Sequence, residues 1–213
     1  MNELEKGLYI ISTPIGNLND ISLRALDILK KTDFIICENP KHSLKLLAKL
    51  GIKKKMYSLH DYNEDKIIKK IENHTLEYSV ILISDAGSPL ISDPGYKLVQ
   101  FYINKKLHVT TIPGPSSVIS SLQVSGMAID SFKFLGFAPK NKSKFENLNL
   151  ISENNSSSNN PYCPITLGVS FLDQINILEN LKRIEFKNVA YPIIFISFIS
   201  RSSEIIGKKI NVK

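Results

Sequence analysis

The sequence has only two cysteines, Cys37 and Cys163, and they lie far apart in the chain. Two distant cysteines exclude a disulfide framework, and neither has the paired spacing that is typical of a metal site. We therefore expect a reducing, cytoplasmic environment and no bound metal.

A long apolar segment is also missing. The longest apolar run, near residues 191–200, is too short to cross a bilayer, which takes about 20 residues. The first residues, MNELEKG, lack the basic and then apolar pattern of a secretory signal. Hydrophobic residues still make up 43% of the 213-residue chain, so we expect a soluble globular protein with no membrane partner.

Several ligand-binding motifs are absent as well. The chain has no GxxxxGK[ST] phosphate-binding loop and no GxGxxG after its first predicted strand. It also lacks the GxSxG nucleophile elbow and the zinc-deaminase pattern. The ordinary mononucleotide and dinucleotide fingerprints are therefore excluded.

Acidic residues are outnumbered by basic ones, which gives the chain a net charge of +7. A basic chain favours a polyanionic partner such as RNA. The sequence is rich in Lys, Asn and Ile together, however, and this trio can also reflect the base composition of a genome. The charge alone leaves both explanations open.

Short apolar runs alternate with segments of helical periodicity through the first part of the chain. The predicted strands are residues 8–12, 34–37, 79–83 and 108–112, and the predicted helices are residues 21–31, 42–51, 64–72, 98–103 and 118–126. Strand 79–83 is continuously apolar, which is typical of a strand covered on both faces. The alternation predicts an α/β fold with a mainly parallel sheet.

The alternation weakens after Gly126. Strands are still predicted at 131–137 and 193–199, with a helix at 171–183, a basic loop at 140–144 and a flexible loop rich in Ser and Asn at 151–160. We place a boundary near residues 113–117. The expected domains are an N-terminal α/β domain, 1–114, and a divergent, shortened C-terminal α/β domain, 115–213.

Four loops rich in Pro, Gly, Ser and Asp follow predicted strands. They are STPIGNL (12–18), CENPKHS (37–43), SDAGSPLISDPG (84–95) and PGPSS (113–117). In a parallel α/β sheet, ligands bind beyond the carboxyl ends of the strands. Pro and Gly fix a backbone path that a ligand can approach closely, and Ser and Asp supply polar groups. The four loops together predict a ligand-binding site.

Read in order, these loops resemble a known family. The matching segments are STPIGNLNDISLRAL (12–26), CENPKHSLKLL (37–47), SLHDYNE (58–64), SDAGSPLISDPGYKLV (84–99) and IPGPSSVISSL (112–122). They are similar to the family that methylates a ribose 2′-hydroxyl in small-subunit ribosomal RNA, a relative of the tetrapyrrole methylases and diphthine synthase. The resemblance covers about residues 8–137. It implies two α/β domains, S-adenosylmethionine in the cleft between them, the small ribosomal subunit as partner, and a homodimer.

The resemblance also implies roles for individual residues. The expected cofactor-binding residues are Pro14, Ile15, Gly16, Asp85, Gly87, Ser88, Gly114, Ser116 and Ser117. Ile15 matches an apolar position that touches the cofactor, and Asp85 matches the acidic residue of the second glycine-rich loop. A carboxylate can accept hydrogen bonds from the cofactor's ammonium or ribose, so the chemistry agrees with the assignment.

Methyl transfer to a hydroxyl depends on positioning and is helped by a base that takes the proton. The candidates for this base are Glu38, His60 and Asp85, and the sequence does not choose among them. Expected substrate-binding residues are Lys41, His42 and Asn63, although Lys41 and His42 are equally consistent with plain solvation. Asp93 is interpreted as a turn or helix N-cap residue.

The chain departs from the family at several places, among them His60-Asp61-Tyr62-Asn63-Glu64 where relatives have His-Glu-His-Asn-Glu. Glu38-Asn39-Pro40-Lys41 stands where relatives have Glu-Asp-Thr-Arg, so a forked guanidinium is replaced by a point charge. The second-domain motifs of relatives are missing around residues 168–174 and 195–204. Two alternatives therefore stay open: another methyltransferase of the superfamily, acting on a small molecule or a protein, or a non-catalytic remnant that binds RNA or the ribosome.

Overall fold

The computed structural model describes residues 4–72, 77–124, 132–137, 163–168, 194–197 and 206–209. The chain divides into two compact units, Met1–Ser116 and Ser117–Lys213. That these units are the two domains expected from the sequence stays a prediction, and each unit is described by itself.

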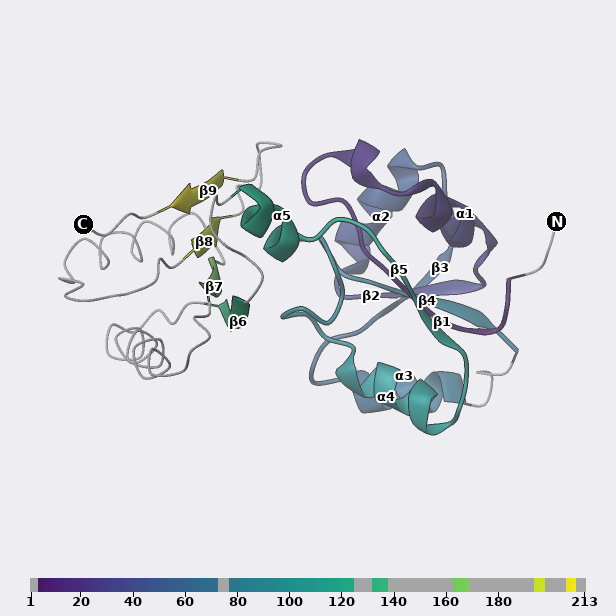
Figure 1. The fold of residues 1–213 in the computed structure, drawn as a ribbon. Coiled ribbons are helices and arrows are strands. Elements are labelled where there is room, and N and C mark those ends of the chain that lie inside the picture. The colour runs from purple at the N-terminus through teal and green to yellow at the C-terminus, as the bar shows by residue number, and fades with distance from the viewer. Residues whose placement is uncertain are drawn as a thin grey trace. The chain divides into compact units, whose positions relative to one another are not determined.

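The first unit is built on a five-stranded parallel sheet. Its strands are β1 (Gly7–Ile11), β2 (Phe34–Cys37), β3 (Lys55–Ser58), β4 (Ser79–Ile83) and β5 (Val109–Ile112). The strand order is β3-β2-β4-β1-β5, and every neighbouring pair is parallel (Figure 1). The α/β class and the mainly parallel first sheet predicted from the sequence are therefore confirmed.

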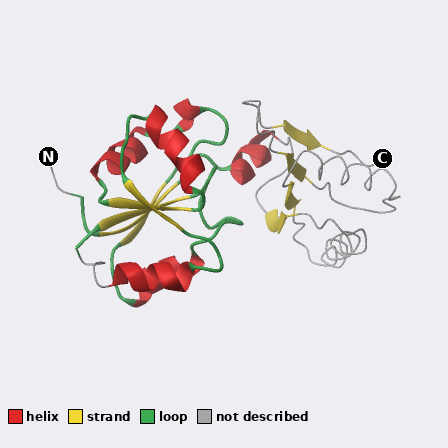
Figure 2. Cartoon of the chain, turned by 180° about the vertical axis from the view of Figure 1, so that it is seen from behind, coloured by secondary structure: helices red, strands yellow, loops and turns green. Residues whose placement is uncertain are grey.

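Helices cover both faces of this sheet. They are α1 (Leu23–Lys31), α2 (Pro40–Lys49), α3 (Glu64–Ile71) and α4 (Tyr96–Asn104), with a short 3₁₀ turn, η1 (Leu18–Asp20), before α1. Helices α1 and α2 pack on one face and α3 and α4 on the other (Figure 2). This three-layer arrangement explains why the central strands are apolar on both sides.

Strand β4 shows how the two faces divide the core. Ile81 and Ile83 pack with α1 and α2, whereas Val80 and Leu82 pack with α3 and α4. All four side chains are buried. Each contributes about 2 kcal/mol by leaving water, so the two helical layers are held mainly by these alternating contacts.

Local capping sets where two of the helices begin. The Ser22 hydroxyl accepts the Ala25 N–H at 3.1 Å and caps α1. The Asn39 side chain caps α2, whose first residue is Pro40. Both caps satisfy backbone N–H groups that have no partner inside the helix.

In its described residues, the second unit has one helix and a four-stranded sheet. Its elements are α5 (Ser117–Val124), β6 (Phe132–Phe137), β7 (Cys163–Gly168), β8 (Ile194–Ser197) and β9 (Ile206–Lys209). The order is β6-β7-β8-β9, and only the β8–β9 pair is antiparallel. The strands predicted at 131–137 and 193–199 are confirmed as β6 and β8. The segments 140–144, 151–160 and 171–183 lie outside the described residues.

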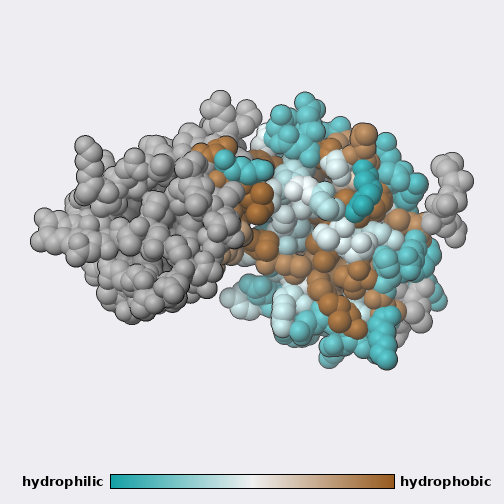
Figure 3. Space-filling model, viewed as in Figure 1, coloured by the Kyte–Doolittle hydropathy of each residue, from teal (hydrophilic) through white to brown (hydrophobic). Residues whose placement is uncertain are grey.

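Within the part of the chain that the structure describes, no helix has the length and apolar character needed to cross a membrane. On the visible face of the first unit, hydrophobic residues are interspersed with hydrophilic ones (Figure 3).

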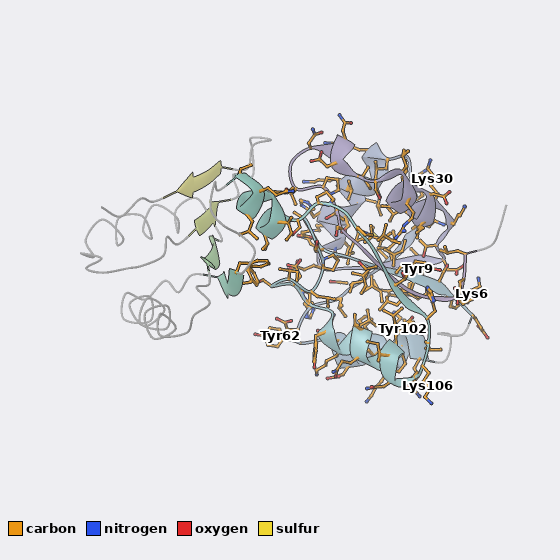
Figure 4. The ribbon with its side chains drawn as sticks, in the orientation of Figure 1. Lys6, Tyr9, Lys30, Tyr62, Tyr102 and Lys106 are labelled. Atoms are coloured by element: carbon orange, nitrogen blue, oxygen red, sulfur yellow. The ribbon has the colours of Figure 1, made fainter. Side chains whose placement is uncertain are left out.

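Two tyrosines of the first unit differ in how their hydroxyls are satisfied (Figure 4). Tyr102 is 0% exposed, and among the described residues its hydroxyl has no hydrogen-bond partner. Burial raises the pKa of Tyr102 well above its ordinary value. The Tyr9 hydroxyl, in contrast, donates to the Glu5 carbonyl oxygen at 2.9 Å.

We predict opposite effects when each tyrosine is changed to phenylalanine. Tyr102→Phe removes an unsatisfied buried hydroxyl and should leave stability unchanged or raise it by about 1 kcal/mol. Tyr9→Phe removes a made hydrogen bond and should lower stability by about 1 kcal/mol. Urea denaturation of the two variants measures both changes. An equal loss of stability in both would contradict the assignment.

Candidate functional site

The loops that follow three adjacent strands meet at the carboxyl edge of the first sheet. They are residues 12–17 after β1, residues 84–95 after β4 and residues 113–116 after β5, and together we call them the three-loop site. Because β4, β1 and β5 are parallel neighbours, their carboxyl ends lie side by side.

Backbone pairing joins the first loop to the second. Thr13 and Gly87 form an antiparallel bridge, in which the Thr13 N–H donates to Gly87 O at 2.9 Å and the Gly87 N–H donates to Thr13 O at 3.0 Å. The Thr13 hydroxyl donates to Ser84 O at 3.2 Å, and the Ser84 hydroxyl donates to Gly87 O at 3.0 Å. Because Thr13 and Ser84 are buried, this junction has a single well-defined geometry.

Serine side chains connect the third loop to the other two. The Ser12 and Ser88 hydroxyl oxygens lie 2.9 Å apart, and the Ser88 hydroxyl donates to Pro115 O at 3.3 Å. A Cβ added at Gly114 would lie 3.0 Å from the Ser12 Cβ, so only glycine fits there without a shift. The three loops therefore form one connected unit.

Gly87 and Ile15 lie against each other inside the three-loop site. Gly87 has a φ of +83°, a backbone conformation that residues with a side chain rarely adopt. A Cβ added there would lie 3.3 Å from Ile15 Cγ2. The half-buried Ile15 thus places an apolar surface beside the glycine backbone.

Nearly all of the predicted cofactor-binding residues lie on these three loops. Besides Ile15 and Gly87, six of them lie on these loops: Pro14, Gly16, Asp85, Ser88, Gly114 and Ser116. Ser117 differs, because it is the first residue of α5 and belongs to the second unit. Their roles toward a cofactor stay predictions.

The long loop after β4 is held at its far end by a buried carboxylate. Glu64, which is 5% exposed, accepts the backbone N–H groups of Gly95, Lys97 and Leu98 at 3.1, 2.9 and 3.2 Å. The carboxylate therefore caps α4 from outside the helix. The sequence does not indicate this role, because a Glu in the first turn of α3 is an ordinary residue at the start of a helix.

Asp93 is not the N-cap of α4, so that part of the interpretation was wrong, although Asp93 does lie in a bend before the helix. The N-cap residue is Gly95, with a φ of +125°, and the Glu64 carboxylate takes the N–H groups that an aspartate cap would accept. Leu90 and Ser92 in the same loop also have positive φ, 73° and 66°. A loop with such backbone strain keeps its shape only because both ends are fixed.

Carboxylates gather beside the three-loop site. Asp85 accepts the Asn39 N–H at 3.3 Å, which connects the loop after β4 to the start of α2. Burial, together with Glu38 and Asp85, raises the pKa of Asp93 to about 6, while a hydrogen bond with Ser84 opposes the rise. Partial desolvation raises the pKa of Glu38, and Asp85 and Asp61 act in the same direction while His42 opposes them.

Carboxylates that raise one another's pKa are mutually repelling, so a positively charged ligand near them would be stabilised. Among the described residues, no group of three or more His, Cys, Asp or Glu side chains is placed to hold a metal ion.

His60 and Asn63 follow β3 at the same edge of the sheet. Asn63 Oδ1 accepts the His60 N–H at 2.9 Å, and Asn63 Nδ2 donates to Ser58 O at 3.0 Å. The side chain of Asn63 therefore holds the turn, while the predicted role in substrate binding stays untested. The turn carries Tyr62, which is 97% exposed and whose ring centroid lies 6.4 Å from that of His60.

Lys41 and His42 lie in the first turn of α2, next to Glu38. Their backbone N–H groups donate to Asn39 Oδ1 at 3.1 and 3.4 Å, and their side chains are exposed. The amino end of a helix favours anions, so this turn suits a phosphate group.

A protein family and several known proteins are similar in sequence to this chain. The family described as tetrapyrrole (corrin/porphyrin) methylases matches residues 7–208. The chain is 47% identical over 143 residues to a protein named ribosomal RNA small subunit methyltransferase I from Vibrio cholerae, a match that covers 66% of this chain and 50% of the relative. A relative of the same name from Rickettsia prowazekii is 48% identical over 138 residues, covering 64% of this chain and 49% of the relative. The chain thus spans about half the length of the curated relatives it matches.

Solved structures agree on the fold. A crystal structure of diphthine synthase gives a TM-score of 0.62 at 16% identity, covering 95% of this chain and 80% of the other. A putative diphthine synthase from Entamoeba histolytica gives 0.58 at 15% identity, covering 96% and 84%. At such low identity the similarity concerns the fold alone.

The raised pKa of Asp93 predicts a pH-dependent effect of Asp93→Asn. An aspartate with a folded-state pKa near 6 and an ordinary pKa when unfolded destabilises the protein progressively as pH rises from about 4 to about 6. Asn carries no charge, so Asp93→Asn should match the wild type at pH 4 and exceed its stability at pH 7.5, by about 1 kcal/mol after allowance for solvent screening.

Thermal unfolding at the two pH values measures this difference, with Asp20→Asn in the exposed η1 turn as the matched control. A stability gain for Asp93→Asn that is equal at both pH values, or a gain of the same size in the control, would contradict the repulsion among these carboxylates.

Proposed function

Because this chain belongs to the tetrapyrrole (corrin/porphyrin) methylase family, we propose that it transfers a methyl group from S-adenosylmethionine to a ribose 2′-hydroxyl of small-subunit ribosomal RNA. The observation that carries the proposal is the junction of the three loops, in which Thr13 pairs with Gly87 and Ser12 contacts Ser88. The curated relatives' shared name supplies the substrate class.

The residues of the three-loop site fit this cofactor chemically. S-adenosylmethionine is a sulfonium compound with an ammonium group, and when bound it supplies an activated methyl group. Asp85 and its neighbouring carboxylates offer negative charge to these cationic groups. Ile15 offers an apolar wall, and the hydroxyls of Ser12 and Ser88 offer polar contacts at the same edge.

A proton acceptor for the ribose hydroxyl is available at the same edge. A carboxylate whose pKa is raised toward neutrality is a stronger base than an ordinary one and still ionises at pH 7. Asp93, with a pKa of about 6, meets this requirement, and the pKa of Glu38, a candidate from the sequence, is also raised. Asp85 and His60 stay candidates, with Asp85 better placed to contact the cofactor through its position on the second loop.

Positive charge near these carboxylates would orient the RNA. Lys41 and His42 at the start of α2 would contact phosphate groups, and the net charge of +7 supports a polyanionic partner. Cytoplasmic location, a homodimer and the cofactor's place between two domains belong to the same proposal.

The decisive experiment is incubation of the purified chain with methyl-labelled S-adenosylmethionine and undermethylated small ribosomal subunits. Label at a ribose 2′-oxygen supports the proposal. Label in another acceptor would favour a different methyltransferase of the family, and binding without transfer would favour a non-catalytic RNA-binding protein.

Replacement of Asp85 tests the site itself. We predict that Asp85→Asn weakens S-adenosylmethionine binding about tenfold, because a charge-assisted hydrogen bond is worth about 1.5 kcal/mol. Asp65→Asn is the matched control, since Asp65 is exposed and pairs with Lys97 on the outer surface of α3. Isothermal titration calorimetry measures both affinities. No binding by the wild type, or an unchanged affinity in Asp85→Asn, would overturn the assignment.

A further inference from the structure

Carboxylates gather at one end of the first unit, and lysines, several of them paired with acidic residues, gather at the other. The carboxyl edge of the sheet carries the carboxylates Glu38, Asp85 and Asp93, whereas lysines gather where the strands begin and the helices end. Lys6, Lys30 and Lys106 lie at that basic end, away from Tyr62 (Figure 4).

Strand β3 connects the two ends along the edge of the sheet. It is the outermost strand on its side, so no further strand covers it. Lys55 and Tyr57 lie at two positions of the same face, because side chains alternate along a strand. The turn with His60 and Tyr62 follows at the carboxyl end, about 13 Å from the start of the strand.

Two lysines share one aromatic ring on this strand. The Nζ atoms of Lys55 and Lys70 lie 5.2 and 4.7 Å from the centroid of the Tyr57 ring. Phe34 packs edge-on against the same ring, with 5.2 Å between the ring centroids. Tyr57 thus attracts both ammonium groups through cation–π contacts.

Neither ammonium group is neutralised. Lys55 and Lys70 are exposed, and neither forms an ion pair with any residue in the described ranges. Two exposed positive charges beside one ring, without an acidic partner, favour an anion. A phosphate group of a nucleic-acid backbone is such an anion.

Tyr62 supplies the second element of a nucleic-acid surface. Its ring is 97% exposed, while the hydrogen bonds of Asn63 fix the turn that carries it. Exposed aromatic side chains can stack on unpaired bases, and nearby lysines can bind the phosphate backbone of the same strand.

We propose that a single-stranded stretch of RNA lies along this edge of the sheet, with phosphates at Lys55 and Lys70 and a base stacked on Tyr62. We call these residues the edge track. The identity of the RNA as the methylation substrate rests on the proposed function, but the track is a separate claim about binding. The strand would run along β3 from Lys55 to the turn that carries Tyr62.

The test measures binding of the full chain to a fluorescent single-stranded RNA of about ten nucleotides, by anisotropy, over a series of salt concentrations. In the variant Lys55→Gln/Lys70→Gln, the slope of log affinity against log salt should fall by about 1.4, because each phosphate contact to a single strand contributes about 0.7. The control Lys30→Gln/Lys106→Gln removes the same charge away from β3 and should keep the wild-type slope.

A second pair of variants tests stacking. Tyr62→Ala should weaken RNA binding roughly tenfold. The control Tyr96→Ala removes another exposed tyrosine, 66% exposed on α4, and should leave the affinity unchanged. Because Tyr62 and both lysines are exposed, a failure to fold is not expected, and S-adenosylmethionine binding reports on the integrity of the site.

The outcomes separate the edge track from the proposed function. Equal losses in the lysine variant and its control, together with no effect of Tyr62→Ala, would overturn the track even if the wild type methylates ribosomal RNA. Selective losses in the track variants would support it even if no methyl transfer is observed.

Discussion

The pairing of Thr13 with Gly87 is the contact on which the candidate site depends. It joins the ends of two neighbouring strands, and it forms only because Gly87 adopts a positive φ. The buried hydroxyls of Thr13 and Ser84 fix the same junction from within, and Ser88 extends it to the loop after β5. A parallel sheet brings strand ends together, but only such cross-loop contacts turn separate loops into one rigid surface.

The same surface carries electrostatic strain. Asp93 and Glu38 are held near Asp85 although their proximity disfavours ionisation, and the loop that carries Asp93 includes non-glycine residues with positive φ. Glu64 holds the end of this loop by accepting three backbone N–H groups. Backbone strain and charge repulsion of this kind persist where function requires them. A cationic ligand would relieve the repulsion among the carboxylates.

The sequence predicted what depends on periodicity and loop chemistry. The buried strands, the helices of the first unit and the four loops followed from apolar runs and from clusters of Pro and Gly. Strand β3 was missed, because its four residues begin with an exposed lysine and show no apolar run. Glu64 and the Thr13–Gly87 pairing were also missed, since contacts between segments far apart in the chain leave no local pattern. The cap of α4 was misassigned to Asp93 for the same reason.

The most direct test of the account is amide hydrogen exchange of the full chain with and without S-adenosylhomocysteine. The account predicts slower exchange in residues 12–17, 84–95 and 113–116 when the ligand is added, with little change in the strand β3 segment that begins at Lys55. No protection at saturating ligand, or protection confined to segments outside the three-loop site, would contradict the claim that these loops hold the cofactor.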